Sequence, residues 1–249
     1  MILELDCGNS LIKWRILRGG EVVASGVAGV AEAALSQLAA LALEGVAVGR
    51  MVSVRSEAET SSVVELFSEF FCIDIHVVRS IAELAGVRNG YLRPDLLGAD
   101  RWMAIVAGYQ MVGHACVILD LGTAVTADFI DAKGAHLGGF IAPGINMMRD
   151  RLSTQTKRVG SSEAVGGVEL ANVLPGDSTA CAVSRGCLLM LRGFAQAQLQ
   201  LAREYFGSSY SVLITGGDGF LLEDIAPEAR IVPDLVFQGL RLACPLGDR

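Results

Sequence analysis

Two short stretches of the sequence decide the fold: ILELDCGNS at residues 2–10 and VILDLGTA at residues 117–124. Each is an apolar run that ends in Asp-x-Gly followed by Asn or Thr, and each leads into a second strand-like stretch. The two aspartates, Asp6 and Asp120, lie nearly half the chain apart. A repeat at this spacing indicates two similar halves. We therefore predict that each half begins with a β-hairpin whose turn carries Asp and Gly.

The chemistry of such a turn suits a phosphate group. Glycine allows the chain to reverse tightly, and the small residues that follow leave backbone N–H groups free to bind phosphate oxygens. The aspartate at the strand end faces the same space and can hold a metal ion or its waters. The ordinary alternative is that an aspartate at this place only makes turn hydrogen bonds.

The rest of the chain alternates between helical and strand patterns, which is typical of α/β domains. We predict a loop with short helical pieces at residues 79–98, and a polar, glycine-rich loop at residues 153–178. Short, tight turns are expected at residues 216–219. The expected helices are 35–43, 57–71, 100–111, 145–152, 179–206 and 220–222, the expected strands are 50–54, 73–78, 134–143 and 210–215, and residues 236–240 close the chain.

Composition points to a cytoplasmic enzyme. Of the 249 residues 52% are hydrophobic, and 27 acidic against 20 basic side chains give a net charge of −7, which argues against nucleic acid or an anionic membrane as a partner. No apolar run approaches the roughly 20 residues that a membrane span needs. The six cysteines are scattered and are expected to be reduced thiols, and the three histidines do not cluster as a zinc site would require.

The two hairpin motifs, followed by TGGDG at residues 215–219, resemble those of the superfamily of acetate and sugar kinases, heat-shock chaperones and actin. A closer resemblance covers nearly the whole chain. DCGNS at 6–10 with Lys13, GADR at 98–101, DLGTA at 120–124 and GGFIAPG at 138–144 are similar to the motifs of type III pantothenate kinases. GADR before a predicted helix is the most specific of these motifs.

This resemblance implies an α/β fold of two tandem ribonuclease H-like (actin-like ATPase) domains, each a mixed sheet flanked by helices, with the nucleotide in the cleft between them. The first domain would be 1–113, with the first phosphate motif, and the second 114–249, with the second phosphate motif and the adenosine turn. The implied reaction is ATP-dependent phosphorylation of pantothenate to 4′-phosphopantothenate, the first step of coenzyme A biosynthesis. ATP with Mg²⁺ and a monovalent cation (K⁺ or NH₄⁺) are the implied cofactors, and the implied assembly is a homodimer with the substrate pocket at its interface.

The resemblance also implies roles for particular residues. Asp100 would be the catalytic base, Asp6 would orient Mg²⁺ through water, and Asp120 would hold the monovalent cation. The implied nucleotide-binding residues are Asp6, Cys7, Gly8, Asn9, Ser10, Lys13, Gly122 and Thr123. The implied pantothenate-binding residues are Tyr91, Gly98, Ala99, Asp100, Arg101 and, from the other subunit, Thr179.

Each role has an ordinary alternative. Asp100 and Thr179 could simply cap the helices that follow them, and Arg101 could make an inter-helix salt bridge. Lys13 could be an exposed strand lysine and Tyr91 a packing residue in a loop. Two other functions stay open: a kinase of the same fold that acts on a sugar or a small acid, and a nucleotide-dependent switch or transcription accessory protein. The GADR motif argues against the first, and the lack of a basic stretch argues against the second.

Overall fold

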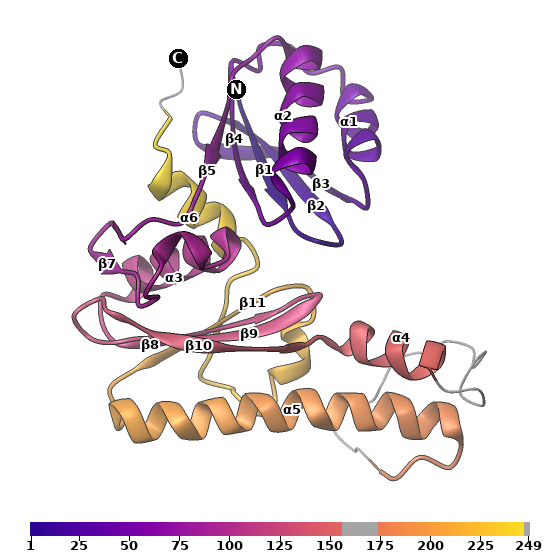
Figure 1. The fold of residues 1–249 in the computed structure, drawn as a ribbon, viewed down its shortest axis with the longest axis vertical. Coiled ribbons are helices and arrows are strands. Elements are labelled where there is room, and N and C mark those ends of the chain that lie inside the picture. The colour runs from indigo at the N-terminus through magenta and orange to yellow at the C-terminus, as the bar shows by residue number, and fades with distance from the viewer. Residues whose placement is uncertain (156–173, 247–249) are drawn as a thin grey trace. The chain divides into compact units, whose positions relative to one another are not determined.

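The computed structural model describes residues 1–155 and 174–246. The chain forms two compact units (Figure 1). Unit 1 consists of Met1–Met111 together with Asp234–Arg249, and unit 2 of Val112–Pro233. The chain therefore leaves unit 1 once and returns to it near its C-terminus.

Unit 1 is built on a five-stranded mixed sheet with the strand order β3-β2-β1-β4-β5. The first three strands are antiparallel neighbours, and β4 and β5 continue the sheet in parallel. Its strands are β1 Ile2–Cys7, β2 Ile12–Arg18, β3 Glu21–Ala28, β4 Val48–Ser53 and β5 Ile75–Val78, with a small hairpin of β6 Glu83–Leu84 and β7 Val87–Arg88. Its helices are α1 Ala31–Ala39, α2 Glu57–Phe71, η1 Pro94–Leu96, α3 Ala99–Val112 and α6 Leu235–Ala243.

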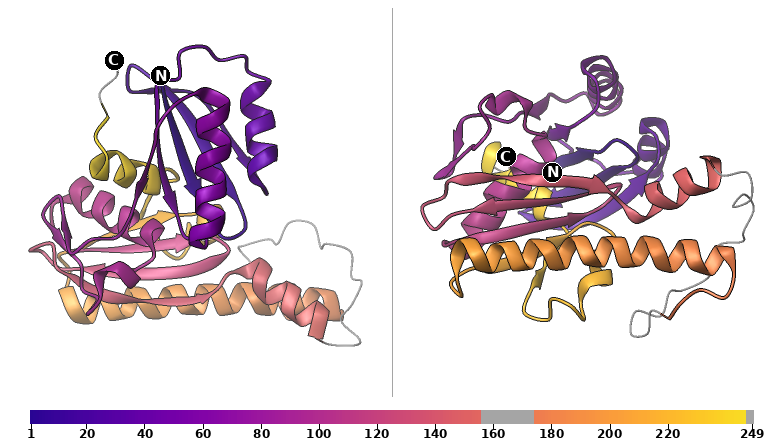
Figure 2. Two further views of the ribbon diagram at one scale, coloured as in Figure 1. Left: turned by 45° about the horizontal axis from the view of Figure 1, so that its top comes forward. Right: turned by 60° about the horizontal axis from the view of Figure 1, so that its bottom comes forward.

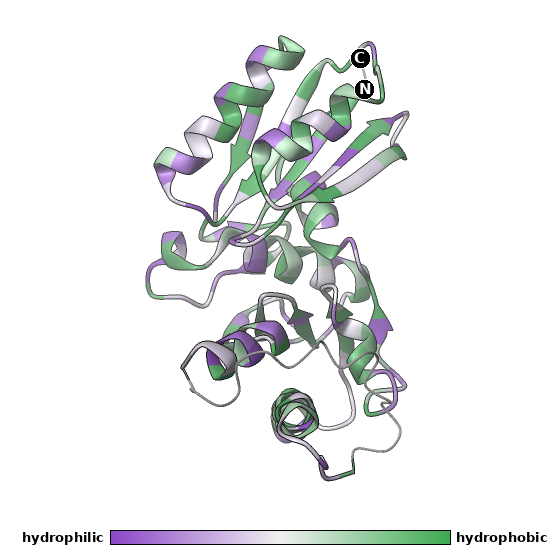
Figure 3. Cartoon of the chain, turned by 90° about the vertical axis from the view of Figure 1, so that its right-hand side faces the viewer, coloured by the Kyte–Doolittle hydropathy of each residue, from purple (hydrophilic) through white to green (hydrophobic). Residues whose placement is uncertain are grey.

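The two faces of this sheet differ in chemistry, because side chains alternate along a strand. Leu3 and Leu5 of β1 pack in one hydrophobic cluster with Leu38 of α1 and Phe67 of α2. The alternate residues of β1, which include Glu4, point to the other face, where α6 contacts β1 and β4 (Figure 1). Figure 3 shows hydrophobic and hydrophilic residues interleaved along α1 and α2, as expected for helices that cover a sheet.

Unit 2 repeats the same strand order, β10-β9-β8-β11-β12. Its strands are β8 Cys116–Leu121, β9 Ala124–Ile130, β10 His136–Pro143, β11 Ser211–Thr215 and β12 Arg230–Ile231, and its helices are α4 Ile145–Gln155, α5 Thr179–Phe206 and η2 Gly219–Leu222. The long helix α5 runs along this sheet (Figure 2), and its residues Leu188 and Leu191 pack with Val117 and Leu119 of β8. In both units, the first strand and its hairpin partner therefore hold equivalent places.

The predicted α/β fold of two sheets flanked by helices is confirmed. The helices predicted at 57–71 and 179–206 have the predicted bounds. The first begins with a capping box between Ser56 and Glu59. Of the loop predicted at 153–178, residues 153–155 extend α4, and residues 156–173 lie outside the described part of the chain.

Several features differ from the sequence-based expectations. The first helix, expected at 35–43, spans Ala31–Ala39. The edge strands β3 and β12 were not predicted. The expected second domain ran from 114 to 249, but residues 234–249 belong to unit 1. The physical reason is that α6 packs on β1 and β4, and that Arg50 Nη1 donates a 2.5 Å hydrogen bond to the Cys244 carbonyl. Among the described residues, no helix has the length and apolar character to cross a membrane.

Candidate active site

The first phosphate motif forms the loop between β1 and β2. Asp6 lies at the end of β1, is 8% exposed, and is the register partner of Lys13 on β2. The loop is held from the segment after β4, where Val54 N donates to Cys7 O at 3.1 Å and Arg55 Nε donates to Gly8 O at 2.9 Å. These bonds fix the turn backbone while Asn9 and Ser10 stay exposed to solvent.

Cys7 contributes to this turn through its backbone. Its side chain belongs to the core cluster on the α1 and α2 face, and its Sγ lies 3.6 Å from Met51 Sδ. The pKa of the Cys7 thiol is raised to about 12, chiefly by burial and in part by the negative charge of the neighbouring Asp6. The thiol is therefore neutral at physiological pH, and any contact of Cys7 with a nucleotide comes from its main chain.

The second phosphate motif forms the equivalent loop in unit 2. Asp120 lies near the end of β8 and is the register partner of Thr126 on β9. Gly122 N donates to Ala124 O at 3.0 Å, which closes a tight turn with Thr123 exposed at its tip. The turn thus has the predicted form of a strand, an aspartate and a glycine-containing reversal.

Two glycines from distant segments brace this second turn. Gly144 N donates to Thr123 O at 3.0 Å, and a Cβ on Gly144 would lie 2.3 Å from Gly122 O. Gly216 has a φ of +87°, and a Cβ there would lie 2.3 Å from Leu121 O and 2.6 Å from Asp120 Oδ1. Only glycine fits such close approaches of backbone to backbone. Both glycine-rich motifs are evident in the sequence, but their packing on the Asp120 turn is evident only in the structure.

The residues of the GADR motif form a second cluster in unit 1, at the start of α3. Arg101 is 7% exposed, and its Nη1 donates to the Tyr91 hydroxyl at 2.9 Å, with the guanidinium 5.7 Å from the centre of the Tyr91 ring. The Tyr91 loop is held by Asn89, whose Oδ1 accepts from Tyr91 N at 3.0 Å and whose Nδ2 donates to Pro94 O at 3.2 Å. The structure therefore brings together Tyr91 and Arg101, which lie ten residues apart in the chain.

Asp100 lies in the first turn of α3, beside these two residues. Its Oδ1 accepts from Arg101 N at 2.6 Å, and a Cβ on Gly98 would lie 2.9 Å from the same oxygen. That Cβ would also lie 3.9 Å from Cγ1 of Val54, whose backbone N binds Cys7 O. Val54 thus links the start of α3 to the first phosphate turn. The position of Asp100 is therefore compatible both with a role at the start of α3 and with a role beside the first phosphate turn.

Thr179 is the first residue of α5 and is exposed. The capping alternative for Thr179 is wrong, because the N-cap of α5 is Ser178, whose hydroxyl accepts from Cys181 N at 3.3 Å. Thr179 lies instead in the wall of an open hollow of about 810 Å³ in unit 2, which Leu152 of α4 and Met190 of α5 also line.

Comparisons with known proteins identify the family of this chain. A sequence model of the family described as type III pantothenate kinase matches residues 2–200. A type III pantothenate kinase of Pseudomonas fluorescens is 49% identical over 248 residues, which cover 99% of this chain and 100% of the relative. The chain belongs to the type III pantothenate kinase family.

The solved structures similar to this family member support its fold. A conserved Campylobacter jejuni protein, assigned to the Baf family of transcriptional activators, has a TM-score of 0.61 and 20% identity, with 96% of this chain and 95% of that one covered. The acetate kinase of Porphyromonas gingivalis has a TM-score of 0.52 and 12% identity, with 97% and 98% covered. At these identities the likeness establishes the shared actin-like ATPase fold and nothing about activity.

The carboxylates of this family member suit a water-bound magnesium ion. Among residues 1–155 and 174–246, no three His, Cys, Asp or Glu side chains gather as a metal-binding group. Mg²⁺ usually keeps several waters and binds through one or two carboxylates together with substrate phosphates. Asp6, a single carboxylate at the end of β1 beside the predicted phosphate turn, matches that requirement.

Proposed function

We propose that this chain transfers the γ-phosphoryl group of ATP to the primary hydroxyl of pantothenate, the first step of coenzyme A biosynthesis. Family membership makes it a pantothenate kinase. The observation that carries the site assignment is the cluster of Tyr91, Asp100 and Arg101 at the start of α3, next to the first phosphate turn. In this cluster Asp100 supplies a carboxylate for the proton of the pantothenate hydroxyl, and Arg101 supplies a cation for the pantothenate carboxylate.

The phosphate groups of ATP are assigned to the two Asp-Gly turns. Backbone N–H groups and the side chains of Asn9, Ser10 and Thr123 donate to phosphate oxygens, and Lys13 neutralises their charge. Phosphoryl transfer asks a protein mainly for positioning and for stabilisation of charge on the transferred group. Mg²⁺, oriented through water by Asp6, would supply further neutralisation. The fixed backbone of both turns supports this assignment.

Pantothenate is assigned to the α3 cluster. Asp100 takes the proton of the attacking hydroxyl, while Gly98 and Ala99 leave room for the chain of the substrate. Arg101 binds the substrate carboxylate with its guanidinium, which is suited to a forked, charge-assisted pair. The hydrogen bond from Arg101 to the Tyr91 hydroxyl supports this role, because it holds the guanidinium in one orientation.

A monovalent cation at Asp120 is also part of the proposal. The carboxylate lies beside the backbone carbonyls of its own turn, and oxygen atoms of this kind are suitable ligands for K⁺ or NH₄⁺. The test compares activity in chloride salts of K⁺, NH₄⁺ and Na⁺ for the wild type and Asp120→Asn. Equal activity of the wild type in all three salts would remove the cation from the proposal.

We further propose a homodimer in which Thr179 of one subunit completes the pocket of the other. The exposed apolar side chains Leu189 and Met190 on α5, near the hollow that holds Thr179, support an interface there. Mixing Asp100→Asn with Thr179→Val chains tests the exchange of residues. Heterodimers would contain one intact pocket, so about a quarter of wild-type activity should return at low pantothenate. No recovery, with exchange of subunits verified by mass, would place Thr179 in its own subunit's pocket or in none.

The function itself is tested by ADP release from the purified protein with pantothenate, glucose, glycerol or acetate as acceptor. Activity with pantothenate alone is the expected result. Activity with another acceptor and none with pantothenate would refute the assignment. We place the enzyme in the cytoplasm, a proposal that its six free cysteines support and that cell fractionation can check.

A further inference from the structure

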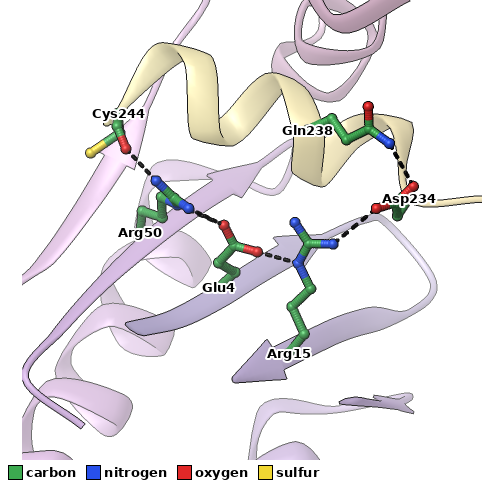
Figure 4. A network of polar contacts seen from close by, with 6 residues as sticks. All are labelled: Glu4, Arg15, Arg50, Asp234, Gln238 and Cys244. Carbon is green, nitrogen blue, oxygen red and sulfur yellow. Dashed lines mark hydrogen bonds and ion pairs between the residues drawn. The ribbon is translucent and has the colours of Figure 1, made fainter. Parts of the chain in front are cut away.

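A buried network of charged side chains lies on the α6 face of the first sheet (Figure 4). At its centre is Glu4 of β1, which is 0% exposed and receives hydrogen bonds from Arg15 Nε of β2 and, at 2.7 Å, from Arg50 Nε of β4. Both arginines are also buried. One carboxylate therefore ties together the three central strands of unit 1.

The network continues to both ends of α6 (Figure 4). Arg15 Nη1 donates to Asp234 Oδ2 at 3.1 Å at the N-cap, and Arg50 Nη1 donates to the Cys244 carbonyl at the C-cap. The Arg15 guanidinium also lies 4.4 Å from the centre of the Phe237 ring. The helix thus covers the charges and excludes water from them, which makes each bond stronger and its loss more costly.

Stability alone is a weak reason for such a network. Removing charges from water is expensive, and apolar residues of similar volume often serve as well or better in the same place. What a buried ion pair adds is a defined geometry, because the charges tolerate few arrangements.

The strand register places the charged network beside Asp6 and Lys13. Glu4 has Arg15 and Arg50 as its Cα partners, and two residues further along the same strands Asp6 has Lys13 and Val52. Residues two apart on a strand lie on the same face, about 7 Å from each other. The charged network is therefore the next row below the Asp6 and Lys13 pair on one face of the sheet.

We infer that Glu4, Arg15 and Arg50 are positioning residues that hold Asp6 and Lys13 in place for the phosphates and metal of ATP, with α6 as the cover of the network. A shift of β2 against β1 would carry Lys13 away from Asp6, and the bonds of Arg15 oppose that shift. This inference rests on the proposed function for the role of Asp6 and Lys13, and one of its tests, the binding of MgADP, does not depend on pantothenate turnover.

The test compares substitutions of Arg15 that keep its length. Arg15→Met removes the charge and retains an apolar stem beside Phe237, while Arg15→Lys restores the charge without the fork that reaches both Glu4 and Asp234. Misplacement of a binding group by about 1 Å can cost up to about a hundredfold. We expect Arg15→Met to lower kcat/KM for MgATP by about tenfold or more, Arg15→Lys to recover part of this, and the KM for pantothenate to change less than about twofold.

Leu38→Ala in α1 is the matched control for stability. Leu38 is fully buried in the same unit but on the opposite face of the sheet, so its substitution lowers the Tm without disturbing the charged row. At a temperature where circular dichroism shows every variant folded, the control should keep the wild-type KM for MgATP. A shift as large as that of Arg15→Met would overturn the inference, because it would follow from lost stability alone.

Two further measurements keep the inference falsifiable. If Arg15→Met does not fold, Arg15→Lys and Asp234→Asn decide, since Asp234 is about half-exposed and its substitution is mild. Wild-type kcat and KM for MgATP in the folded variants would overturn the inference. Binding of MgADP by calorimetry gives the same comparison without an acceptor. Weaker MgADP binding by the Arg15 variants would support the positioning role even if the wild type failed to phosphorylate pantothenate.

Discussion

Substitution of Arg101 is the sharpest test of how the enzyme recognises its acceptor. In Arg101→Met the guanidinium that donates to the Tyr91 hydroxyl is lost, and with it the proposed partner of the pantothenate carboxylate. A hydrogen bond to a charged group contributes about 1.5–3 kcal/mol. Since 1.4 kcal/mol is about a factor of ten, the KM for pantothenate should rise by about 10- to 150-fold.

The companion variant Tyr91→Phe separates orientation from charge. It keeps the ring beside the guanidinium and removes only the hydroxyl that accepts from Nη1 at 2.9 Å. This hydrogen bond orients Arg101 and does not itself contact the substrate, so we expect only about 0.5–1.5 kcal/mol of the effect to appear in pantothenate binding. We therefore expect a smaller rise in the KM for pantothenate, of about two- to tenfold, with kcat within a factor of about two in this variant.

The assay compares pantothenate with its uncharged primary amide in steady-state kinetics with saturating MgATP. The wild type should prefer the acid, because the amide cannot form a forked ion pair with Arg101. Arg101→Met should lose most of this preference, chiefly because its kcat/KM for pantothenate falls while that for the amide changes little. If Arg101→Met discriminated between acid and amide as the wild type does, Arg101 would not bind the carboxylate. A KM for MgATP that rose in parallel would point to a disturbed phosphate turn instead.

The remaining predictions concern the base, the glycine brace and the pH dependence of stability. Asp100→Asn should leave MgADP binding near normal and lower kcat by a factor of about 10² or more, the range of general acid–base groups; an unchanged kcat would remove Asp100 from that role. Gly216→Ala should destabilise unit 2 by about 2 kcal/mol or more, because it forces a Cβ against backbone at a left-handed φ. Gly193→Ala, where a Cβ on α5 meets nothing within 4 Å, should be neutral or stabilising; equal Tm values for both variants would contradict the close approach. Burial raises the pKa of Asp218, with Arg149 partly opposing the rise. A raised folded-state pKa favours the folded state at pH values below the unfolded pKa, and that contribution is lost as the pH rises through the folded pKa. The Tm of Asp218→Asn should therefore exceed that of the wild type at pH 7 and approach it towards about pH 4; a gap that widened on acidification would refute the reasoning.

The sequence by itself determined the features that depend on local pattern. The alternation of apolar residues and the Asp-Gly turns gave both hairpins, because strand periodicity and glycine at a reversal are read over a few residues. The helices 57–71 and 179–206 could be delimited for the same reason, since caps and helical periodicity are local. The edge strand β3 was missed, because Val23 and Val27 lie on its exposed face while the small residues Ala24 and Gly26 lie on its less exposed face, so hydrophobicity does not follow burial along this strand.

Only the tertiary structure decided which distant residues meet. That Gly144 and Gly216 brace the Asp120 turn, and that Arg101 donates to Tyr91, follow from packing between segments and not from any periodicity. The same holds for the return of residues 234–246 to the first unit, where Arg15 and Arg50 of different strands share Glu4 and bind both ends of α6. A charged residue in a strand pattern looks like a solvent-facing position. Its burial becomes evident only when a helix from the far end of the chain covers it, since burial is a property of the whole fold.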